Sequence, residues 1–203
     1  MDEDIFLSFS HKEGFTLIET LLAITLLSGV VIGLFYFFTN AMTYTSYNQG
    51  RTVAINIAHG VAAYMEKLDF SALEQHVRQS ANEQTPFVKL TDADCENAAI
   101  FPEPDACRAQ FSPTINNVIY DNGRIAVFLI PYERTLWERL SASPPEEFPR
   151  SLRKRIREEA EKVQQSDSGL GQYVLKMYAI VHWGDRSEEA EWVEGVITDE
   201  TIR

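Results

Sequence analysis

Residues 12–38 of this 203-residue chain read KEGFTLIETLLAITLLSGVVIGLFYFF. From Phe15 to Phe38 the segment carries one charged side chain, Glu19, in 24 residues, whereas the other 179 residues carry 47 of the 48 charges. Because a helix of about 20 apolar residues already crosses the roughly 30 Å hydrocarbon core of a bilayer, the segment predicts a membrane-spanning helix over residues 15–38. This distribution of charge excludes a wholly soluble protein.

The composition of the whole chain excludes other classes of protein. A net charge of −12 without a long basic tract argues against a dedicated nucleic-acid binder, whose affinity comes mainly from neutralising phosphates. With 45% hydrophobic and 11% aromatic residues, the chain can form a core, which argues against intrinsic disorder. The part outside the apolar segment is long enough for one small globular head.

The flanks of the apolar segment predict its orientation. Lys12 precedes it, and no Lys or Arg follows until Arg51, so the positive-inside rule places the N-terminus in the cytoplasm and the head outside. A secretory signal peptide is the rival interpretation. Its apolar part would be about 7–15 residues followed by a cleavage site of small residues, whereas this one continues into aromatic residues.

The residues from Lys12 to Glu19, followed by the long apolar run, resemble the class III leader junction of type IV pilins and pseudopilins. The resemblance implies a leader peptide at residues 1–14, cleaved between Gly14 and Phe15 by prepilin peptidase, and N-methylation of Phe15. It also implies that Glu19 of one subunit faces the Phe15 amine of its neighbour in a filament. The implied partners are that peptidase, other pilin or pseudopilin subunits, and inner-membrane lipid before assembly.

Elementary chemistry is consistent with this spacing. Cleavage creates an α-amino group with a pKa near 8, which is mostly cationic at neutral pH. A buried pair between that amine and Glu19 would set the register of neighbouring helices, since removing one partner leaves an uncompensated charge. Gly14 lets an extended backbone enter a protease cleft without a side chain. The alternative is that Glu19 lies in the headgroup layer of an ordinary signal anchor.

Two features differ from the main building block of a pilus. No proline occurs before Pro86, so the apolar helix should be continuous. Gly29 and Gly33 form a Gly-x-x-x-Gly pair that permits close helix contact, or they are two glycines that an anchor tolerates. These features favour a minor pilin or pseudopilin.

The rest of the chain predicts an α+β fold in which the long N-terminal helix packs on a small antiparallel sheet of about four strands. Residues 39–80 are expected to continue the helix toward the head, and the head itself is expected at residues 81–203. Within that region, the regular helix is expected to end near Phe70. Its apolar stripe would consist of Ala54, Ala58, Val61, Met65 and Leu68. Strands are expected only after residue 117, with a hairpin at Asn122-Gly123, a buried central strand at 125–130, and an antiparallel pair at 173–183 and 191–198.

Residues 133–168 read as a helical insertion, with helices at 133–140 and 150–165 separated by a proline-rich break. The insertion would cover the back of the 125–130 strand or present a subunit contact. Its basic cluster could touch DNA, but Lys154, Arg155 and Arg157 each have a Glu four residues on, so we expect a self-paired surface and no DNA contact.

Cys95 and Cys107 are the only cysteines, and in an exported head they are expected to form a disulfide; free thiols would imply a reducing habitat. They lack the partners of a zinc site, and Asp92, Asp94, Glu96 and Glu103 lack the turn glycine of a calcium loop, so no metal is expected. No cofactor-binding or catalytic motif occurs, so neither an enzyme nor a small-molecule substrate is expected.

The expected function is that of a minor pilin or pseudopilin in a type IV pilus or related filament, for assembly, adhesion, secretion or DNA uptake. The expected location is the inner membrane, with a single pass, and then the filament. The alternatives are a type II secretion pseudopilin and a signal-anchored extracytoplasmic binding domain that never polymerises.

Overall fold

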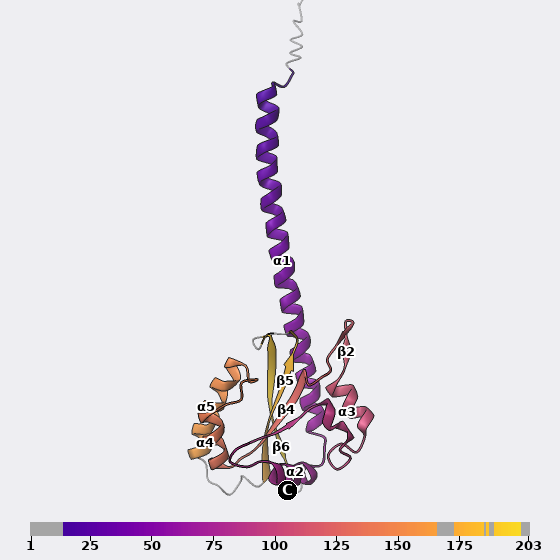
Figure 1. Ribbon diagram of the computed structural model, residues 1–203, viewed down its shortest axis with the longest axis vertical. Helices are drawn as coiled ribbons and strands as arrows, with labels where there is room; N and C mark the ends of the chain where they lie inside the picture. The colour runs from indigo at the N-terminus through magenta and orange to yellow at the C-terminus, as the bar shows by residue number, and fades with distance from the viewer. Residues whose placement is uncertain (1–13, 166–172, 185, 187–188, 200–203) are drawn as a thin grey trace, which may run out of the picture. The chain divides into compact units, whose positions relative to one another are not determined.

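The computed structural model describes residues 14–165, 173–184, 186 and 189–199 (Figure 1). The chain divides into two compact units, Met1–Ser46 and Tyr47–Arg203. The first unit contains the N-terminal part of helix α1, which runs from Leu17 to Met65. The second unit contains the end of α1 and all later elements. The predicted leader, residues 1–14, lies outside the described residues except for Gly14.

The second unit is built on a four-stranded antiparallel sheet in the order β1-β4-β5-β6. The strands are β1 (Val88–Leu90), β4 (Ile125–Pro131), β5 (Val174–His182) and β6 (Ala190–Thr198). Strand β4 is central and buried along almost its whole length, and β5 and β6 pair over nine residues each. The predicted α+β class, the central strand and the final antiparallel pair are confirmed.

One face of the sheet lies against α1. The helix contributes a stripe of small and apolar side chains, and further apolar residues come from α2 (Phe70–Ser80), the 3₁₀ turn η1 (Asp92–Glu96) and α3 (Pro104–Phe111). The buried members of the α1 stripe are Ala54, Ile57, Ala58, Val61, Ala62 and Met65. The predicted stripe is therefore confirmed, with Leu68 partly buried beside it.

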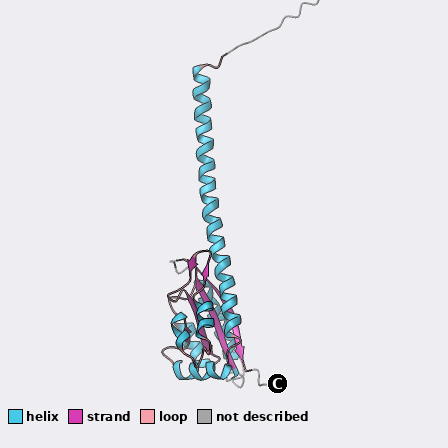
Figure 2. Cartoon of the chain, turned by 90° about the vertical axis from the view of Figure 1, so that its right-hand side faces the viewer, coloured by secondary structure: helices cyan, strands magenta, loops and turns pink. Residues whose placement is uncertain are grey.

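The other face of the sheet carries a second core beneath α4 (Arg134–Ala142) and α5 (Arg150–Gln165). Because side chains alternate along a strand, Phe128 of β4 and Tyr178 of β5 point to this face while their neighbours point to α1. Phe148, in the break between the two helices, packs edge-on against Phe128 with ring centroids 4.7 Å apart. Helices therefore cover both faces of the sheet (Figure 2), and the insertion covers the back of β4 as predicted.

The long helix ends earlier than predicted. It stops at Met65 instead of near Phe70, and residues 70–80 form the separate helix α2 instead of a continuation. Asp69 causes the new start, because its carboxylate accepts a hydrogen bond from the Ala72 N–H at 2.8 Å, as an N-cap does. The break redirects the chain so that Leu73 and Val77 join the core.

The predicted hairpin at Asn122-Gly123 is wrong. These two residues do form a turn with positive φ, but the preceding strand β3 (Val118–Ile119) pairs back with β2 (Thr114–Ile115) through a turn at Asn116-Asn117. Strand β4 cannot accept β3, since β1 and β5 occupy its two edges. The expectation that strands begin only after residue 117 is also wrong, because the short strands β1 and β2 precede that residue.

Candidate processing and assembly segment

The proposed cleavage junction lies just before the first turn of α1. Gly14, Phe15 and Thr16 are not helical, and the helix begins at Leu17. The Phe15 side chain is 82% exposed, and a side chain added at Gly14 would meet no atom within 4 Å. The Gly14–Phe15 peptide bond is therefore outside regular structure and sterically open.

Glu19 and Thr16 cap this end of the helix. The Thr16 N–H donates to Glu19 Oε2 at 3.4 Å, and the Glu19 N–H donates to Thr16 Oγ1 at 3.3 Å. This reciprocal pattern is that of a capping box, which satisfies two of the backbone N–H groups that a helix start leaves free. The helix dipole also favours a carboxylate at this end. No Lys or Arg among the described residues pairs with Glu19.

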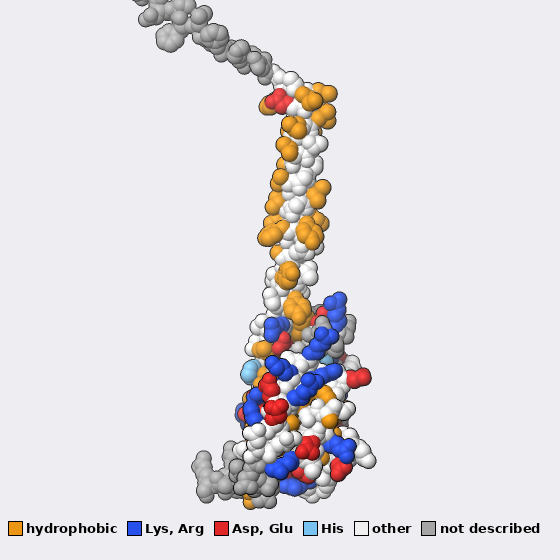
Figure 3. All heavy atoms as spheres, turned by 90° about the vertical axis from the view of Figure 1, so that its left-hand side faces the viewer, with side chains coloured by type: hydrophobic (Ala, Val, Ile, Leu, Met, Phe, Trp, Pro, Cys, Tyr) orange, Lys and Arg blue, Asp and Glu red, His pale blue; other side chains and the backbone are white. Residues whose placement is uncertain are grey.

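The part of α1 that follows Glu19 has the properties of a membrane span. It is the one described helix that is long and apolar enough to cross a bilayer, and none of its most apolar window is buried. Figure 3 shows hydrophobic side chains along this helix and a mixture of acidic and basic ones on the head. The hydroxyls of Thr20, Thr25 and Ser28 each donate to a carbonyl of the preceding turn, so they are satisfied in an apolar medium.

Gly29 and Gly33 make no close contact within the chain. A Cβ added at either position would meet no described atom within 4 Å. Neither glycine is required for packing against the described part of the subunit. This observation fits both interpretations, which are close helix contact between subunits and two glycines that an anchor helix tolerates. The predicted helix-packing role stays a prediction.

Sequence reasoning missed the contacts that hold α1 where it enters the second unit. A Cβ added to Gly50 would lie 2.7 Å from Cε3 of Trp183, so the indole packs directly on the helix backbone. The Tyr47 ring meets the same indole edge-on at 4.7 Å between centroids, and Arg51 pairs with Glu191 at 2.5 Å. Two features of the sequence could have indicated this contact: Gly50 lies in the middle of a helix, and Trp183 ends a run of alternating apolar residues.

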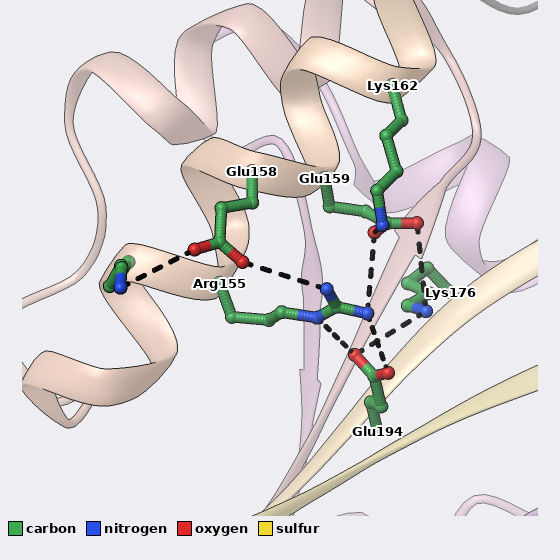
Figure 4. A network of polar contacts seen from close by, with 7 residues as sticks. Arg155, Glu158, Glu159, Lys162, Lys176 and Glu194 are labelled. Atoms are coloured by element: carbon green, nitrogen blue, oxygen red, sulfur yellow. Dashed lines mark hydrogen bonds and ion pairs between the residues drawn. The ribbon is translucent and has the colours of Figure 1, made fainter.

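An ion-pair network joins α5 to the sheet (Figure 4). The Nε and Nη2 groups of the Arg155 guanidinium donate to the two oxygens of the Glu194 carboxylate of β6, each at 2.9 Å. Lys176 of β5, whose side chain is 9% exposed, lies 3.8 Å from Glu194 and 3.9 Å from Glu159. The hydrogen bond from Arg155 holds the pKa of Glu194 below its ordinary value, against the opposing effect of burial.

The self-pairing predicted for the basic cluster of α5 is confirmed in part. Lys154 lies 3.8 Å from Glu158, and Arg155 lies 3.7 Å from Glu159. The predicted pair between Arg157 and Glu161, two exposed residues of α5, is absent from the described ion pairs. Arg155 is directed to the sheet instead of to solvent, which sequence spacing could not show.

The predicted disulfide is present between Cys95 of η1 and Cys107 of α3, with 5.5 Å between the Cα atoms. The nearby acidic residues take part in local structure. Asp94 caps η1 by accepting from the Thr91 N–H, Asp92 accepts from the Gly123 N–H at 3.0 Å, and Glu96 pairs with Arg108. Within the described ranges, no group of three or more His, Cys, Asp or Glu side chains could hold a metal ion.

Comparisons with known proteins yield no relative. No family model, curated protein or solved structure matches the chain.

Proposed function

We propose that this chain is a minor pilin or pseudopilin, cleaved after Gly14 and incorporated through α1 into a type IV pilus or a related filament. The observation that carries the proposal is the state of Glu19. It is the single charge of a 24-residue apolar segment, five residues into the chain that cleavage would leave, and it pairs with no cation among the described residues.

A carboxylate at the edge of an apolar helix needs a positive partner when the helix leaves water. In the proposed filament that partner is the new α-amino group of Phe15 in a neighbouring subunit. The pair would form only in one axial register of the two helices, so it would select correct assembly.

The apolar surface of α1 supports the same proposal. Its exposed side chains include Leu21, Leu22, Ile24 and Leu26, which lie on different sides of the helix, so no single face is reserved for one partner. Such a helix suits lipid on all sides before assembly and the helices of several subunits afterwards. The contacts that are specific to one neighbour would then come from the head, which is a compact unit from residue 47 onward.

The proposed role is structural and not enzymatic. The runner-up within the family is a type II secretion pseudopilin, which shares the same leader junction. The other candidate is an anchored extracytoplasmic binding domain that never polymerises, and the state of the N-terminus together with recovery in filaments distinguishes it.

The test is mass spectrometry of the N-terminus of the protein purified from membranes of its own host. We expect a chain that begins at N-methylated Phe15. Gly14→Val should block cleavage, because a branched side chain would enter the peptidase cleft. Gly29→Ala is the control, since it changes a nearby glycine, within α1, whose added Cβ would meet no described atom within 4 Å, and it should be processed normally.

An intact Met1 in the wild-type protein would contradict the proposal. A cut beyond Phe38 would contradict it as well and would identify a signal peptide instead. Normal processing without recovery in sheared filaments or in a secretion complex would favour the anchored binding domain.

A further inference from the structure

The two edges of the sheet differ in length and protection. Strand β1 forms one edge with only three residues, whereas β6 forms the other with nine. Short strands, prolines, bulges and lysines are the usual means by which an edge avoids pairing with other chains. Strand β6 has no proline or lysine, and its register with β5 continues without a bulge from Thr198 to Ala190.

The direction of the backbone groups of β6 follows from the bonds at its two ends. The Trp183 N–H donates to the Glu189 carbonyl, and the Asp199 N–H donates to the Tyr173 carbonyl. Because hydrogen-bonded pairs alternate along an antiparallel ladder, the odd-numbered residues of β6 bond to β5. The even-numbered ones direct their N–H and C=O groups to the free edge: Ala190, Trp192, Glu194, Val196 and Thr198.

The outward groups from Trp192 to Thr198 are open in the described structure, whereas Ala190 is buried. No hydrogen bond described for residues 190–198 reaches them, and the Val196 side chain is 42% exposed. The acidic side chains of β6 do not protect the edge as free charges, since Glu191 pairs with Arg51 and Glu194 pairs with Arg155 inside this chain.

At the β6 edge, the two faces of the sheet carry different chemistry. On the α5 side, Trp192 and Val196 offer apolar surface. On the α1 side, Glu66 has its carboxylate beside Gly195 and forms no ion pair with a described residue, and Glu191 lies further along the same side. An added strand would therefore place apolar residues on one side and basic residues on the other.

We infer that β6 is a docking edge for an extended segment of another protein, which adds a fifth strand with β-branched residues beside Trp192 and Val196 and with Lys or Arg beside Glu66. Main-chain hydrogen bonds would supply affinity, and the alternating side chains would supply selectivity. This inference goes beyond the proposed function and does not depend on cleavage at Gly14.

A second copy of the chain fits this edge poorly. Arg51 pairs with Glu191 and Glu66 lies beside Gly195, so β6 runs in the same direction as the part of α1 that packs on it. A twofold axis through the edge would pair two β6 strands antiparallel and make these helix segments run in opposite directions. A second β6 strand also contains no Lys or Arg to place beside Glu66, so it lacks the charge that this side of the edge favours.

The test uses the full-length chain in detergent micelles and a synthetic peptide of about six residues, the usual length of a strand, in which valine and lysine alternate. Amide hydrogen exchange, followed by NMR, reports on Trp192, Glu194 and Val196. We expect these outward amides to exchange fast in the free protein and at least about tenfold more slowly with saturating peptide. The inward amides of Val193 and Ile197 should be protected in both states.

Two controls separate strand addition from electrostatic attraction. The same peptide with alternate backbone amides N-methylated keeps its charge and should give no protection. Val196→Pro removes one outward N–H without breaking the ladder to β5 and should weaken peptide binding by about tenfold or more. Val196→Thr keeps the N–H and should bind as the wild type does.

Several results would overturn the inference. These are protection by the N-methylated peptide, equal binding by Val196→Pro, or no protection by the unmodified peptide. Protection of the outward amides in the absence of peptide would also overturn it. In that case a concentration-dependent dimer would identify a second copy as the occupant of the edge, and a monomer would identify the chain's own tail. If Val196→Pro does not fold, the N-methylated peptide still decides. None of these results depends on whether the N-terminus is processed.

Discussion

Glu19 is the residue on which the proposed function depends, and we propose that it has two roles at different stages. In the described chain its carboxylate caps the first turn of α1 through Thr16. In a filament the same carboxylate would face a neighbour's amine. A glutamine can fill the first role but not the second, because it keeps an acceptor oxygen without the charge.

We predict that Glu19→Gln and Glu19→Ala are both processed at Gly14 but are both incorporated poorly into filaments. The loss should be about tenfold or more, since an amine buried without its partner costs about 3–5 kcal/mol. Sheared filaments and membranes are compared by quantitative immunoblot. Normal incorporation of Glu19→Gln would show that the cap matters and that the charge pair does not exist.

Gly50 lets the Trp183 ring approach the backbone of α1, and this contact has a direct test. We predict that Gly50→Ala lowers the stability of the head by about 1–3 kcal/mol, because the new Cβ would lie 2.7 Å from the indole and force repacking. Urea unfolding followed by tryptophan fluorescence measures the change.

Gly60→Ala is the matched control on the same helix. Its Cβ would meet Gln110 Oε1 at 3.6 Å, an ordinary contact, and alanine favours the helix by up to about 1 kcal/mol. We expect an unchanged or raised stability. Equal effects of the two substitutions would show that the contact with Trp183 is unimportant.

At the scale of elements, α5 is held to the sheet by its apolar face and by the network around Glu194. The bond from Arg155 lowers the pKa of Glu194, and Lys176 acts in the same direction. A carboxylate with a lowered pKa stabilises the fold at pH values above its ordinary pKa of about 4.3. That stabilisation disappears as the pH falls through the lowered pKa and the group becomes protonated in the folded state too.

We therefore predict that Arg155→Gln destabilises the head by about 1–2 kcal/mol at pH 7. The difference from wild type should shrink as the pH falls from about 5 through the lowered pKa of Glu194. Thermal unfolding across that range measures it. Lys154→Gln is the control, since its pair with Glu158 is solvent-exposed and should contribute less at every pH. A destabilisation by Arg155→Gln that does not vary with pH would contradict the role of the charge pair.

At the scale of the whole molecule, the chain divides where its amphipathic pattern begins. All buried hydrophobic residues described lie at Ala54 or later, whereas the exposed apolar side chains are concentrated between Phe15 and Tyr47. The division into units at residue 47 follows this change. The head therefore has its own core, disulfide and sheet without the apolar part of α1.

We predict that a fragment of residues 47–203 is soluble without detergent, contains the Cys95–Cys107 disulfide and unfolds cooperatively. The full-length chain should require detergent, because its α1 exposes apolar surface on all sides. Circular dichroism, thiol labelling and size-exclusion chromatography test this. Aggregation of the oxidised fragment would show that residues before 47 are needed to complete the head.

Much of the fold was predictable because the patterns concerned are local. One charge in 24 residues predicted the long apolar helix, and the spacing of three and four along residues 54–68 predicted its buried stripe. The second helix of the insertion has the predicted bounds, 150–165, because its amphipathic pattern ends where the helix does. The resemblance to a leader junction is equally local, so the roles proposed for Gly14, Phe15 and Glu19 rest on the sequence alone.

Tertiary structure alone decided which strands pair and which contacts hold the elements together. Asn122-Gly123 forms its turn, but the partner of β3 depends on whether the edges of β4 are free, and no local pattern records that. The approach of Trp183 to Gly50 joins residues more than 130 positions apart. The open edge of β6 likewise arises only once the order of the sheet is set. Local periodicity selects helices and strands, whereas packing in three dimensions selects their neighbours.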